Sequence, residues 1–442
     1  MKKADLRKGM RIPVRIDSLG SGGEGVARFD DFVVFVRGGA PGDECEVELD
    51  IVKRTYAAGR LVSLTNPSPV RKAPECRHFG RCGGCQLQHV AYDEQIRIKE
   101  RNIVDAIERI GGVRGFDFGG VLPTRPFGYR NKVQFVCSGG VLGLYQYNSH
   151  DLVRIDGCML QTDLSNEALR ACSAVINDGR FEKRALRHLG IRTTSLGFAH
   201  VTFVASKRNL TGVRRAAKAL MALVPAVKGV TLNVNPEKTN VILGRESSLL
   251  CGEESVTERV LGVEFKVNCE SFFQVNRDGA EEMVRIVLSF LPERSGSAFL
   301  DAYCGSGFFS MFAAGRFARV VGVEENPSSV AEAMRVAASN GISNAEFVRG
   351  RTEEYLAGAD SGDIGCALVD PPRKGLDPSV AAALSRSGAE RVIYVSCNPA
   401  TLARDLRLFV AGGFRVVAVK GIDMFPQTSH VETITLLTRA VS

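Results

Sequence analysis

The sequence predicts an α/β protein with three parts: a small β-barrel, a mixed α+β region and a C-terminal, mostly parallel sheet. Short apolar runs separated by Gly-rich turns fill residues 11–64, and strand-like and helical pieces are mixed over residues 129–262. From residue 297 onward, apolar strand-like segments alternate with helical ones. Strict alternation of strands and helices is typical of an open parallel sheet covered on both faces, and this pattern decides the fold class.

The length of the chain allows two or three domains, because 442 residues with 45% hydrophobic content exceed what one core usually organises. We predict domains at 1–67, 68–266 and 267–442, with a helical segment at 93–111 that is a candidate to pack on the last of them. The Pro- and Ser-rich stretch TNPSPVRKAP, which follows the first domain, is interpreted as a linker.

The first domain is predicted to be a five-stranded barrel of the OB type. Tight turns such as GSGGEG and APGD separate its five strand-like segments, RIPVRIDSL, GVARFD, FVVFVRGG, ECEVELDIVKR and AGRLVSL. Closely spaced strands with such turns are typical of barrels that bind single-stranded nucleic acid.

The middle region is the most basic part of the chain. It is predicted to place a helix near residues 211–223 among strands at KVQFVC, HVTFVAS, GVTLNVN and VILGR. The formal net charge of the whole chain is +8, and residues 161–255 carry 14 Lys and Arg against 8 Asp and Glu. This distribution favours a polyanion such as RNA as partner, although enzymes with neutral substrates can have a similar isoelectric point.

The sequence gives no sign of export or membrane insertion. No N-terminal stretch joins a basic head to a continuous apolar run, and nowhere do eighteen apolar residues follow one another. We therefore expect a cytoplasmic protein without a membrane partner, and we expect it to be a monomer.

Twelve cysteines in a large chain without an export signal indicate free thiols or metal ligands, not a disulfide framework. Cys76, Cys82 and Cys85 have the spacing C-x5-C-x2-C, and Cys158 lies in a separate polar turn, RIDGC. Three thiolates from one loop and one from a remote turn can hold either zinc or a 4Fe-4S cluster, and their spacing does not choose between the two. The other cysteines outside the catalytic motif are interpreted as buried thiols: Cys45, Cys137, Cys172, Cys251, Cys269, Cys304 and Cys366.

A nucleoside-binding site is predicted at the C-terminal sheet. The segment DAYCGSG is a Gly-rich turn after a strand, and the next strand ends in Glu324 about twenty residues on, where a carboxylate can accept hydrogen bonds from ribose hydroxyls. Asp370 follows another strand in VDPPRKG, and its alternative role is to cap the following turn. In an open α/β sheet these strand ends lie at one edge, so the sequence predicts a shared cleft.

The same edge is predicted to carry a nucleophile and a base. Cys397 ends the apolar strand VIYVSC directly before a helix-opening sequence, NPATLARDL, and Glu432 opens the strand VETITLLTR. A thiolate in a cleft is suited to covalent catalysis, and a desolvated carboxylate to proton abstraction. The alternatives are a buried structural thiol at Cys397 and an ordinary edge-strand charge at Glu432.

These motifs, taken together and in order, resemble the S-adenosylmethionine-dependent RNA 5-methyluridine methyltransferases, particularly the bacterial enzymes that act on 23S ribosomal RNA. The resemblance runs nearly end to end. It rests on GSGGEGVARFDDFVVFVRGGAPGDECEV, CRHFGRCGGCQLQHVAYDEQIRIK, GLYQYNSHDLVRIDGCMLQ, ESFFQVN, DAYCGSG, VDPPRKG, VSCNPATLARDL and HVETITLLTR.

The resemblance implies a TRAM domain at the N-terminus, a Rossmann-like methyltransferase domain at the C-terminus and two cofactors. S-Adenosylmethionine would be bound by Gln274, Tyr303, Glu324 and Asp370, and a 4Fe-4S cluster by Cys76, Cys82, Cys85 and Cys158. Cys397 matches the family's nucleophile and Glu432 its general base. The chain departs from several relatives at Phe308, where they have a polar residue, and Arg351 lies near a position where some offer an amide to the cofactor.

Several alternatives stay open at this point. The uracil could lie in the T-loop of transfer RNA instead of ribosomal RNA, or the chain could be a non-catalytic RNA-binding or assembly factor. A cytosine-5 methyltransferase is disfavoured because DPPRKG lacks the extra cysteine, and a radical enzyme because its cluster loop would be C-x3-C-x2-C. The residues that we would test for RNA contact are Phe127, Tyr129, Arg130 and Lys132, with packing in a sheet as the alternative.

Overall fold

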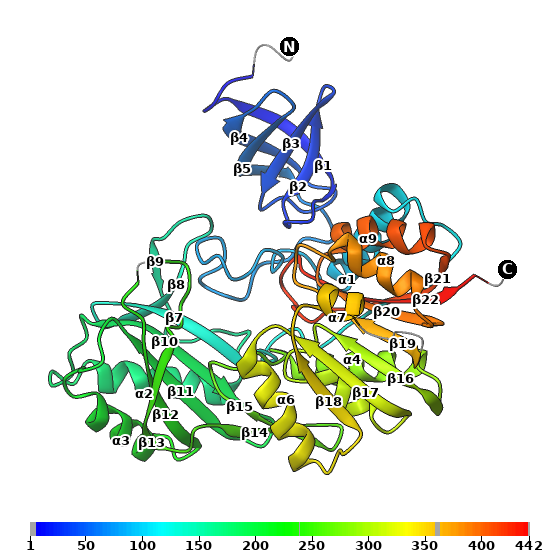
Figure 1. Ribbon diagram of the computed structural model, residues 1–442. Coiled ribbons are helices and arrows are strands. Elements are labelled where there is room, and N and C mark those ends of the chain that lie inside the picture. Colours follow the sequence, from blue (N-terminus) through cyan, green and yellow to red (C-terminus); the bar gives the residue numbers. More distant parts are fainter. Residues whose placement is uncertain (1–5, 238, 359–362, 441–442) are drawn as a thin grey trace.

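The computed structural model describes residues 6–237, 239–358 and 363–440 and confirms the predicted fold class. A closed five-stranded barrel stands apart at the N-terminal end of the molecule, above a seven-stranded mixed sheet and an eight-stranded, mostly parallel sheet (Figure 1). Among the described residues, no helix is both long enough and apolar enough to cross a membrane.

The barrel has the strand order β1-β2-β3-β5-β4. Its strands are β1 (Arg11–Leu19), β2 (Gly25–Phe29), β3 (Phe32–Arg37), β4 (Glu44–Val52) and β5 (Tyr56–Asn66). Residues alternate between core and solvent along each strand, as the sequence pattern of β1 shows: Ile12, Val14 and Ile16 are buried between exposed neighbours.

The segment interpreted as a linker is fastened to the barrel. The Asp43 carboxylate is fully buried; its Oδ1 accepts hydrogen bonds from the backbone N–H of Ser68 (2.9 Å) and from the Arg71 guanidinium (Nε, 3.0 Å). These bonds hold the pKa of Asp43 below its ordinary value against the opposing effect of its burial. The chain therefore leaves the barrel in a fixed direction.

The middle sheet has the order β13-β12-β11-β10-β7-β8-β9, with helices α2 (Asp163–Ile176) and α3 (Val213–Leu223) packed into its core. Its strands are β7 (Lys132–Ser138), β8 (Val141–Tyr145), β9 (Leu152–Arg154), β10 (Leu186–Thr193), β11 (Ala199–Ala205), β12 (Val227–Val234) and β13 (Glu246–Gly252).

The strand predicted at VILGR is wrong. Residues 241–245 lie outside any strand, and the edge strand begins afterwards, at Glu246. The Asn235 side-chain amide donates to the carbonyls of Val241 (2.7 Å) and Ile242 (3.0 Å), so these carbonyls are satisfied without a strand partner. Val241 is 63% exposed, although its apolar side chain is of the kind expected to be buried in a strand.

The C-terminal sheet has the order β18-β17-β16-β19-β20-β22-β21-β6. Its strands are β6 (Asp117–Leu122), β16 (Ser295–Ala302), β17 (Phe317–Glu324), β18 (Ala345–Arg349), β19 (Ile364–Val369), β20 (Arg391–Ser396), β21 (Phe414–Ile422) and β22 (Glu432–Arg439). β22 runs antiparallel to both of its neighbours. β6 comes from far upstream and pairs in parallel with β21, and its Gly-containing sequence, DFGGVL, gave no strand prediction.

Two cores cover the two faces of this sheet. Along β16, Phe299 belongs to one core and Leu300 to the other, as the two-residue period of a strand requires. Helices α4 (Arg277–Phe290), α5 (Phe308–Ala313) and α6 (Pro327–Ser339) contribute to the first core, together with the hairpin of β14 (Val256–Val260) and β15 (Val263–Val267). The second core receives α7 (Thr352–Gly358), α8 (Pro378–Arg386), α9 (Pro399–Ala411), α1 (Tyr92–Asp105) and the π-helix η2 (Ala106–Ile110).

Helix α1, from the helical segment predicted at 93–111, thus packs on the C-terminal sheet, and Figure 1 shows it beside α9. The exact domain boundaries at 67/68 and 266/267 stay a prediction.

Candidate active site

Cys397 is held between the end of β20 and the start of α9. The hydroxyl of Ser396 accepts from the N–H of Asn398 (3.1 Å), whose own side chain caps the helix by accepting from the N–H of Ala400 (3.1 Å). Pro399 then opens the helix with its fixed φ. The sequence SCNP therefore fixes the thiol at the carboxyl edge of the sheet, as the strand-to-helix pattern predicted.

One cavity of about 950 Å³ brings together all six residues predicted for catalysis and cofactor binding. Its wall contains Gln274, Tyr303, Glu324, Asp370, Cys397 and Glu432. Phe272, Arg351, Arg373, Lys374, Arg404, Phe425 and His430 also line it. Most of these residues come from loops at strand ends of the C-terminal sheet, whereas Phe272 and Gln274 lie between β15 and α4, and Arg404 lies on α9.

The Gly-rich turn after β16 forms one end of the cavity. The Glu324 carboxylate accepts from the backbone N–H of Gly305 (3.1 Å) and of Asn326 (2.8 Å), which fixes it beside the turn. Tyr303 has a φ of 65°, a left-handed conformation that is uncommon for a residue other than glycine. A Cβ added at Gly305 would meet no atom within 4 Å, so the turn faces open space.

Phe308 belongs to the wall of the site. It is 8% exposed, and its ring packs edge-on against Phe273 at 5.6 Å between centroids and against Phe309 at 5.1 Å. An aromatic cluster thus occupies the place where several relatives of the resembled family have a polar side chain.

Burial raises the pKa of two carboxyl groups of the cavity, those of Glu432 and Asp370. Burial, and secondarily the negative charge of Asp370, raises the pKa of Glu432 to about 8, while Arg373 opposes this shift. Burial, and then Asp301, raises the pKa of Asp370 to about 7. Both groups can therefore exchange protons near neutral pH.

Arg373 is the cation that acts on the thiol. Burial raises the pKa of Cys397, and the Glu432 carboxylate raises it further. The charge of Arg373 and its hydrogen bond to the thiol lower it. Our interpretation of VDPPRKG singled out its aspartate and missed this arginine, although a basic residue three positions after Asp370 was visible in the sequence.

A buried aspartate on α9 fixes the loop that carries Arg373. Asp405 accepts hydrogen bonds from the N–H of Leu376 (2.8 Å) and the hydroxyl of Tyr394 (2.7 Å), and Arg404 donates to the carbonyl of Lys374 (2.9 Å). Nothing in the sequence marked Asp405, because its partners lie in two other segments.

The four predicted metal-binding cysteines lie within electrostatic reach of one another. Burial, and then the charges of Cys158, Cys82 and Cys76, raises the pKa of Cys85 to about 12. The Gln88 amide donates to the Cys85 sulfur (3.3 Å) and accepts from the N–H of Cys76 (3.2 Å). All twelve cysteines are free, and within the described ranges no set of three or more His, Cys, Asp or Glu side chains is already arranged as metal ligands.

Of the seven other cysteines, six are buried as expected: Cys45, Cys137, Cys172, Cys269, Cys304 and Cys366. Cys251 is only half-buried, and its thiol contacts the Met221 sulfur at 3.3 Å.

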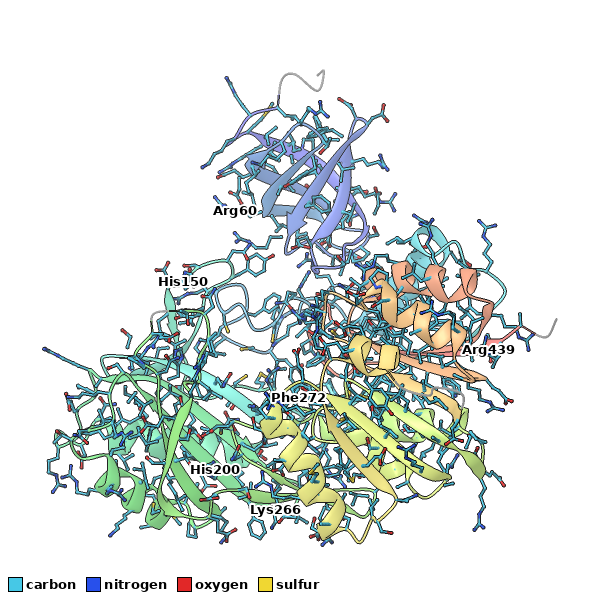
Figure 2. The ribbon with its side chains drawn as sticks, in the orientation of Figure 1. Arg60, His150, His200, Lys266, Phe272 and Arg439 are labelled. Atoms are coloured by element: carbon cyan, nitrogen blue, oxygen red, sulfur yellow. The ribbon has the colours of Figure 1, made fainter. Side chains whose placement is uncertain are left out.

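Tyr129, which we named as a residue to test for RNA contact, takes the alternative role of a packed side chain. Its side chain is 4% exposed, and its hydroxyl donates to the carbonyl of Pro426 (3.0 Å), so its ring cannot stack on a base. Lys132 is also largely enclosed: it donates to the carbonyl of Ser271 (3.0 Å), and burial lowers its pKa to about 8. The free aromatic surface at the cavity is instead Phe272, which is 71% exposed and lies between the middle and C-terminal domains (Figure 2).

Comparisons with known proteins match this arrangement. A family model described as tRNA (Uracil-5-)-methyltransferase matches residues 142–440, and a TRAM domain model matches residues 5–62. An uncharacterized RNA methyltransferase of Thermosynechococcus vestitus is 39% identical over 444 residues, covering 98% of this chain and 99% of that protein. An uncharacterized RNA methyltransferase of Bacillus cereus is 35% identical over 453 residues and covers 98% of both chains.

Among solved structures, the Pyrococcus abyssi tRNA (uracil-54, C5)-methyltransferase in complex with S-adenosyl-L-homocysteine is similar with a TM-score of 0.78. It is 27% identical in sequence, and the match covers 97% of this chain and 100% of that one.

Proposed function

Since the chain belongs to the tRNA (uracil-5-)-methyltransferase family and is an RNA methyltransferase, we propose that it forms 5-methyluridine with Cys397 as nucleophile and Glu432 as base. The observation that carries this proposal is one cavity whose wall contains both side chains together with the Gly-rich turn. The family assignment confirms the resemblance expected from the motifs. A non-catalytic role is disfavoured because the thiol and the carboxyl face one enclosed space.

The methyl donor in this proposal is S-adenosylmethionine, which supplies an electrophilic methyl group on a sulfonium. Glu324, already fixed by two backbone N–H groups, is placed to accept from ribose hydroxyls, and the open space beside Gly305 admits a ligand. Gln274, Tyr303 and Asp370 would complete the binding site.

Cys397 would start the reaction by attacking carbon 6 of the uracil. The sulfur–carbon bond forms, and the electrons of the C5–C6 double bond move to carbon 5, which then takes the methyl group. Arg373 favours the thiolate by its charge and its hydrogen bond. A uracil stacked in folded RNA cannot reach this thiol, so the base must be flipped out or already unpaired.

Glu432 would complete the reaction by taking the proton from carbon 5. The C5–C6 double bond then forms again, and the Cys397 thiolate leaves carbon 6. A base is most useful when its pKa lies near the working pH, and burial brings Glu432 to about 8.

We propose 23S ribosomal RNA as the substrate, with the T-loop of transfer RNA as the second candidate. The resemblance of the motifs to the bacterial enzymes that act on 23S ribosomal RNA supports ribosomal RNA, whereas the solved relative from Pyrococcus abyssi, a tRNA (uracil-54, C5)-methyltransferase, favours transfer RNA. The test is transfer of labelled methyl groups to total RNA from cells that lack this gene, followed by mapping. Label in 5-methyluridine supports the reaction, and its position decides the substrate; label in another nucleoside contradicts the proposal.

The four cysteines are proposed to hold a 4Fe-4S cluster, with zinc as the alternative. The donor set fits: burial raises the pKa of the Cys82, Cys85 and Cys158 thiols, so a cationic centre would offset the charge of their thiolates, and the Gln88 side-chain and Gly84 backbone N–H groups donate to the Cys85 and Cys82 sulfurs. Complete cysteine ligation leaves no open iron position, which supports a structural role. Anaerobic purification should give a brown protein, and a colourless protein with stoichiometric zinc would contradict the cluster.

A further inference from the structure

Residues 423–431 form a loop, here called the 423–431 loop, between β21 and the base Glu432. It places Phe425 and His430 in the wall of the active-site cavity. Segments from all three parts of the chain contact this loop, although nothing in its sequence, DMFPQTSHV, announces a junction. Its conformation therefore depends on contacts from outside the catalytic sheet.

Gln427 lies at the centre of this junction. It is fully buried and has a φ of 69°, a left-handed conformation that costs free energy for a residue other than glycine. Its carbonyl accepts from the backbone N–H of both Gln86 and Leu87, each at 3.0 Å. Gln86 is the residue directly after Cys85, so a single peptide bond separates the cysteine loop from the contact that holds Gln427.

Gln95 on α1 braces the same contact from the other side. Its amide accepts from the N–H of Gln427 (3.1 Å) and donates to the Gln427 side-chain oxygen (3.0 Å) and to the carbonyl of Leu87 (3.0 Å). The Gln427 side-chain nitrogen has no partner among the described residues. The backbone of Gln427, more than its amide group, therefore carries the connection.

Two further contacts enclose the junction. At the start of the loop, the Lys99 ammonium and the Asp423 carboxylate form a fully buried ion pair at 2.6 Å. From the barrel, a Cβ added at Gly23 would lie 2.8 Å from the Gln86 Cβ and 3.5 Å from the Ser429 Cβ, so the GSGGEG turn closes directly over both segments.

We infer that Gln427 is a positioning residue through which the four-cysteine loop sets the active site. A ligated loop holds Gln86 and Leu87, these hold the left-handed backbone of Gln427, and that conformation fixes where His430 and Glu432 stand. Downstream, the Thr428 hydroxyl accepts from the N–H of His430 (3.3 Å), which continues the connection toward the base. The inference rests on the proposed ligation of the cysteines, and it requires no contact between the cluster and the RNA.

Two substitutions of Gln427 separate backbone conformation from side-chain chemistry. Gln427→Gly and Gln427→Val both remove the side-chain amide and keep the backbone N–H and carbonyl. Glycine adopts a positive φ readily, whereas β-branched valine does not. We expect Gln427→Val to have a kcat at least about 10-fold below that of Gln427→Gly, with similar KM values for RNA, because base placement and not RNA binding is disturbed. Equal kcat values for the two variants would overturn the positioning role.

Hydrogen exchange tests the link to the cysteine loop without an activity readout. In the wild-type holoprotein, chelation of the metal should increase amide exchange in both 76–88 and 423–431. In Gln427→Val the amides of residues 423–431 should already exchange fast before chelation, so that chelation changes their exchange rate little. Asn233→Ala, which removes a buried amide bridging to Gly244 in the middle sheet, is the matched control and should leave 423–431 as in the wild type.

Exchange that rises after chelation only within 76–88 would overturn the inference while leaving the proposed cluster intact. Metal analysis of the same sample separates the two failures. If the purified protein holds no metal, the proposed ligation fails, and Cys85→Ala then decides the coupling by the same exchange readout: faster exchange at 423–431 supports it, and unchanged exchange contradicts it.

Discussion

The active-site cavity and the four-cysteine loop both gather residues that are distant in sequence, but by different means. Strand order brings the cavity residues together, and hydrogen bonds such as those on Glu324 and Asp405 fix them before any ligand binds. The cysteine loop has little regular structure, and burial there raises the pKa of Cys82 and Cys85. The fold thus forms the active-site cavity without a ligand, whereas the four-cysteine loop is expected to depend on its metal ligand.

The sharpest contrast should appear between two cysteines of the C-terminal domain. Cys397→Ala is expected to reduce methyl transfer on the order of 10⁴-fold or more, because it removes the proposed nucleophile, with little change in thermal stability. The matched control is Cys366→Ala, a buried position on β19 of the same sheet, which should cost roughly 1–2 kcal/mol of stability and leave turnover measurable. Residual activity of Cys397→Ala near the wild-type rate would remove its assigned role.

The base should matter less than the nucleophile. Glu432→Gln keeps the shape of the side chain but cannot take the proton, so turnover is expected to fall by about 10²–10⁴-fold. Single-turnover kinetics with labelled donor would locate the loss after methyl transfer. A variant slowed before methyl transfer would assign Glu432 to a different step.

Removing a cysteine ligand should affect stability more than cofactor binding. Cys158→Ala is expected to lose the metal and to lower the Tm by about 5 °C or more, since a ligand that binds only the folded state stabilises it. Binding of S-adenosylmethionine, measured by calorimetry, should change by less than about 3-fold, because the four residues proposed to bind it, Gln274, Tyr303, Glu324 and Asp370, lie outside the 423–431 loop. If Cys158→Ala lost both thermal stability and S-adenosylmethionine binding, the active-site cavity would also depend on the ligand of the cysteines, which contradicts this account.

The smallest predicted effect is the pH-dependent contribution of Glu432 to the thermal stability of the protein. Its ordinary pKa is 4.5 and burial raises it to about 8, so the folded state holds this proton more tightly than the unfolded chain does. The cost of charging the buried group is absent below pH 4.5, grows between 4.5 and 8, and is complete above 8. Glu432→Gln should therefore raise the Tm relative to wild type by at least about 2 °C at pH 9 and hardly at all at pH 4.5. An equal difference at both pH values would contradict the raised pKa.

The sequence predicted most of the cavity because its signals are local. Cys397 follows an apolar strand and precedes Asn-Pro, and Glu324 ends the strand after a Gly-rich turn, so a few neighbouring residues carry each prediction. Strand alternation likewise located the C-terminal strands from β16 to β22.

Apart from Arg373, the features that sequence reasoning missed depend on long-range pairing. β6 becomes a strand only because β21 accepts it at the edge of the sheet, and VILGR is kept out of the neighbouring sheet by the Asn235 amide. Gln427 adopts its left-handed backbone because two distant N–H groups require its carbonyl. No local pattern encodes such partners, which explains why these predictions failed or were never made.

The most direct test of the account uses wild-type enzyme and RNA that contains 5-fluorouridine. Fluorine at carbon 5 cannot be removed as a proton, so attack and methyl transfer should proceed and the adduct should stay covalent. Proteolysis and mass spectrometry should then find the methylated fluorouridine on the peptide that contains Cys397. An adduct on any other residue, or methylation of normal RNA with no adduct on the fluorinated RNA, would contradict the proposed mechanism.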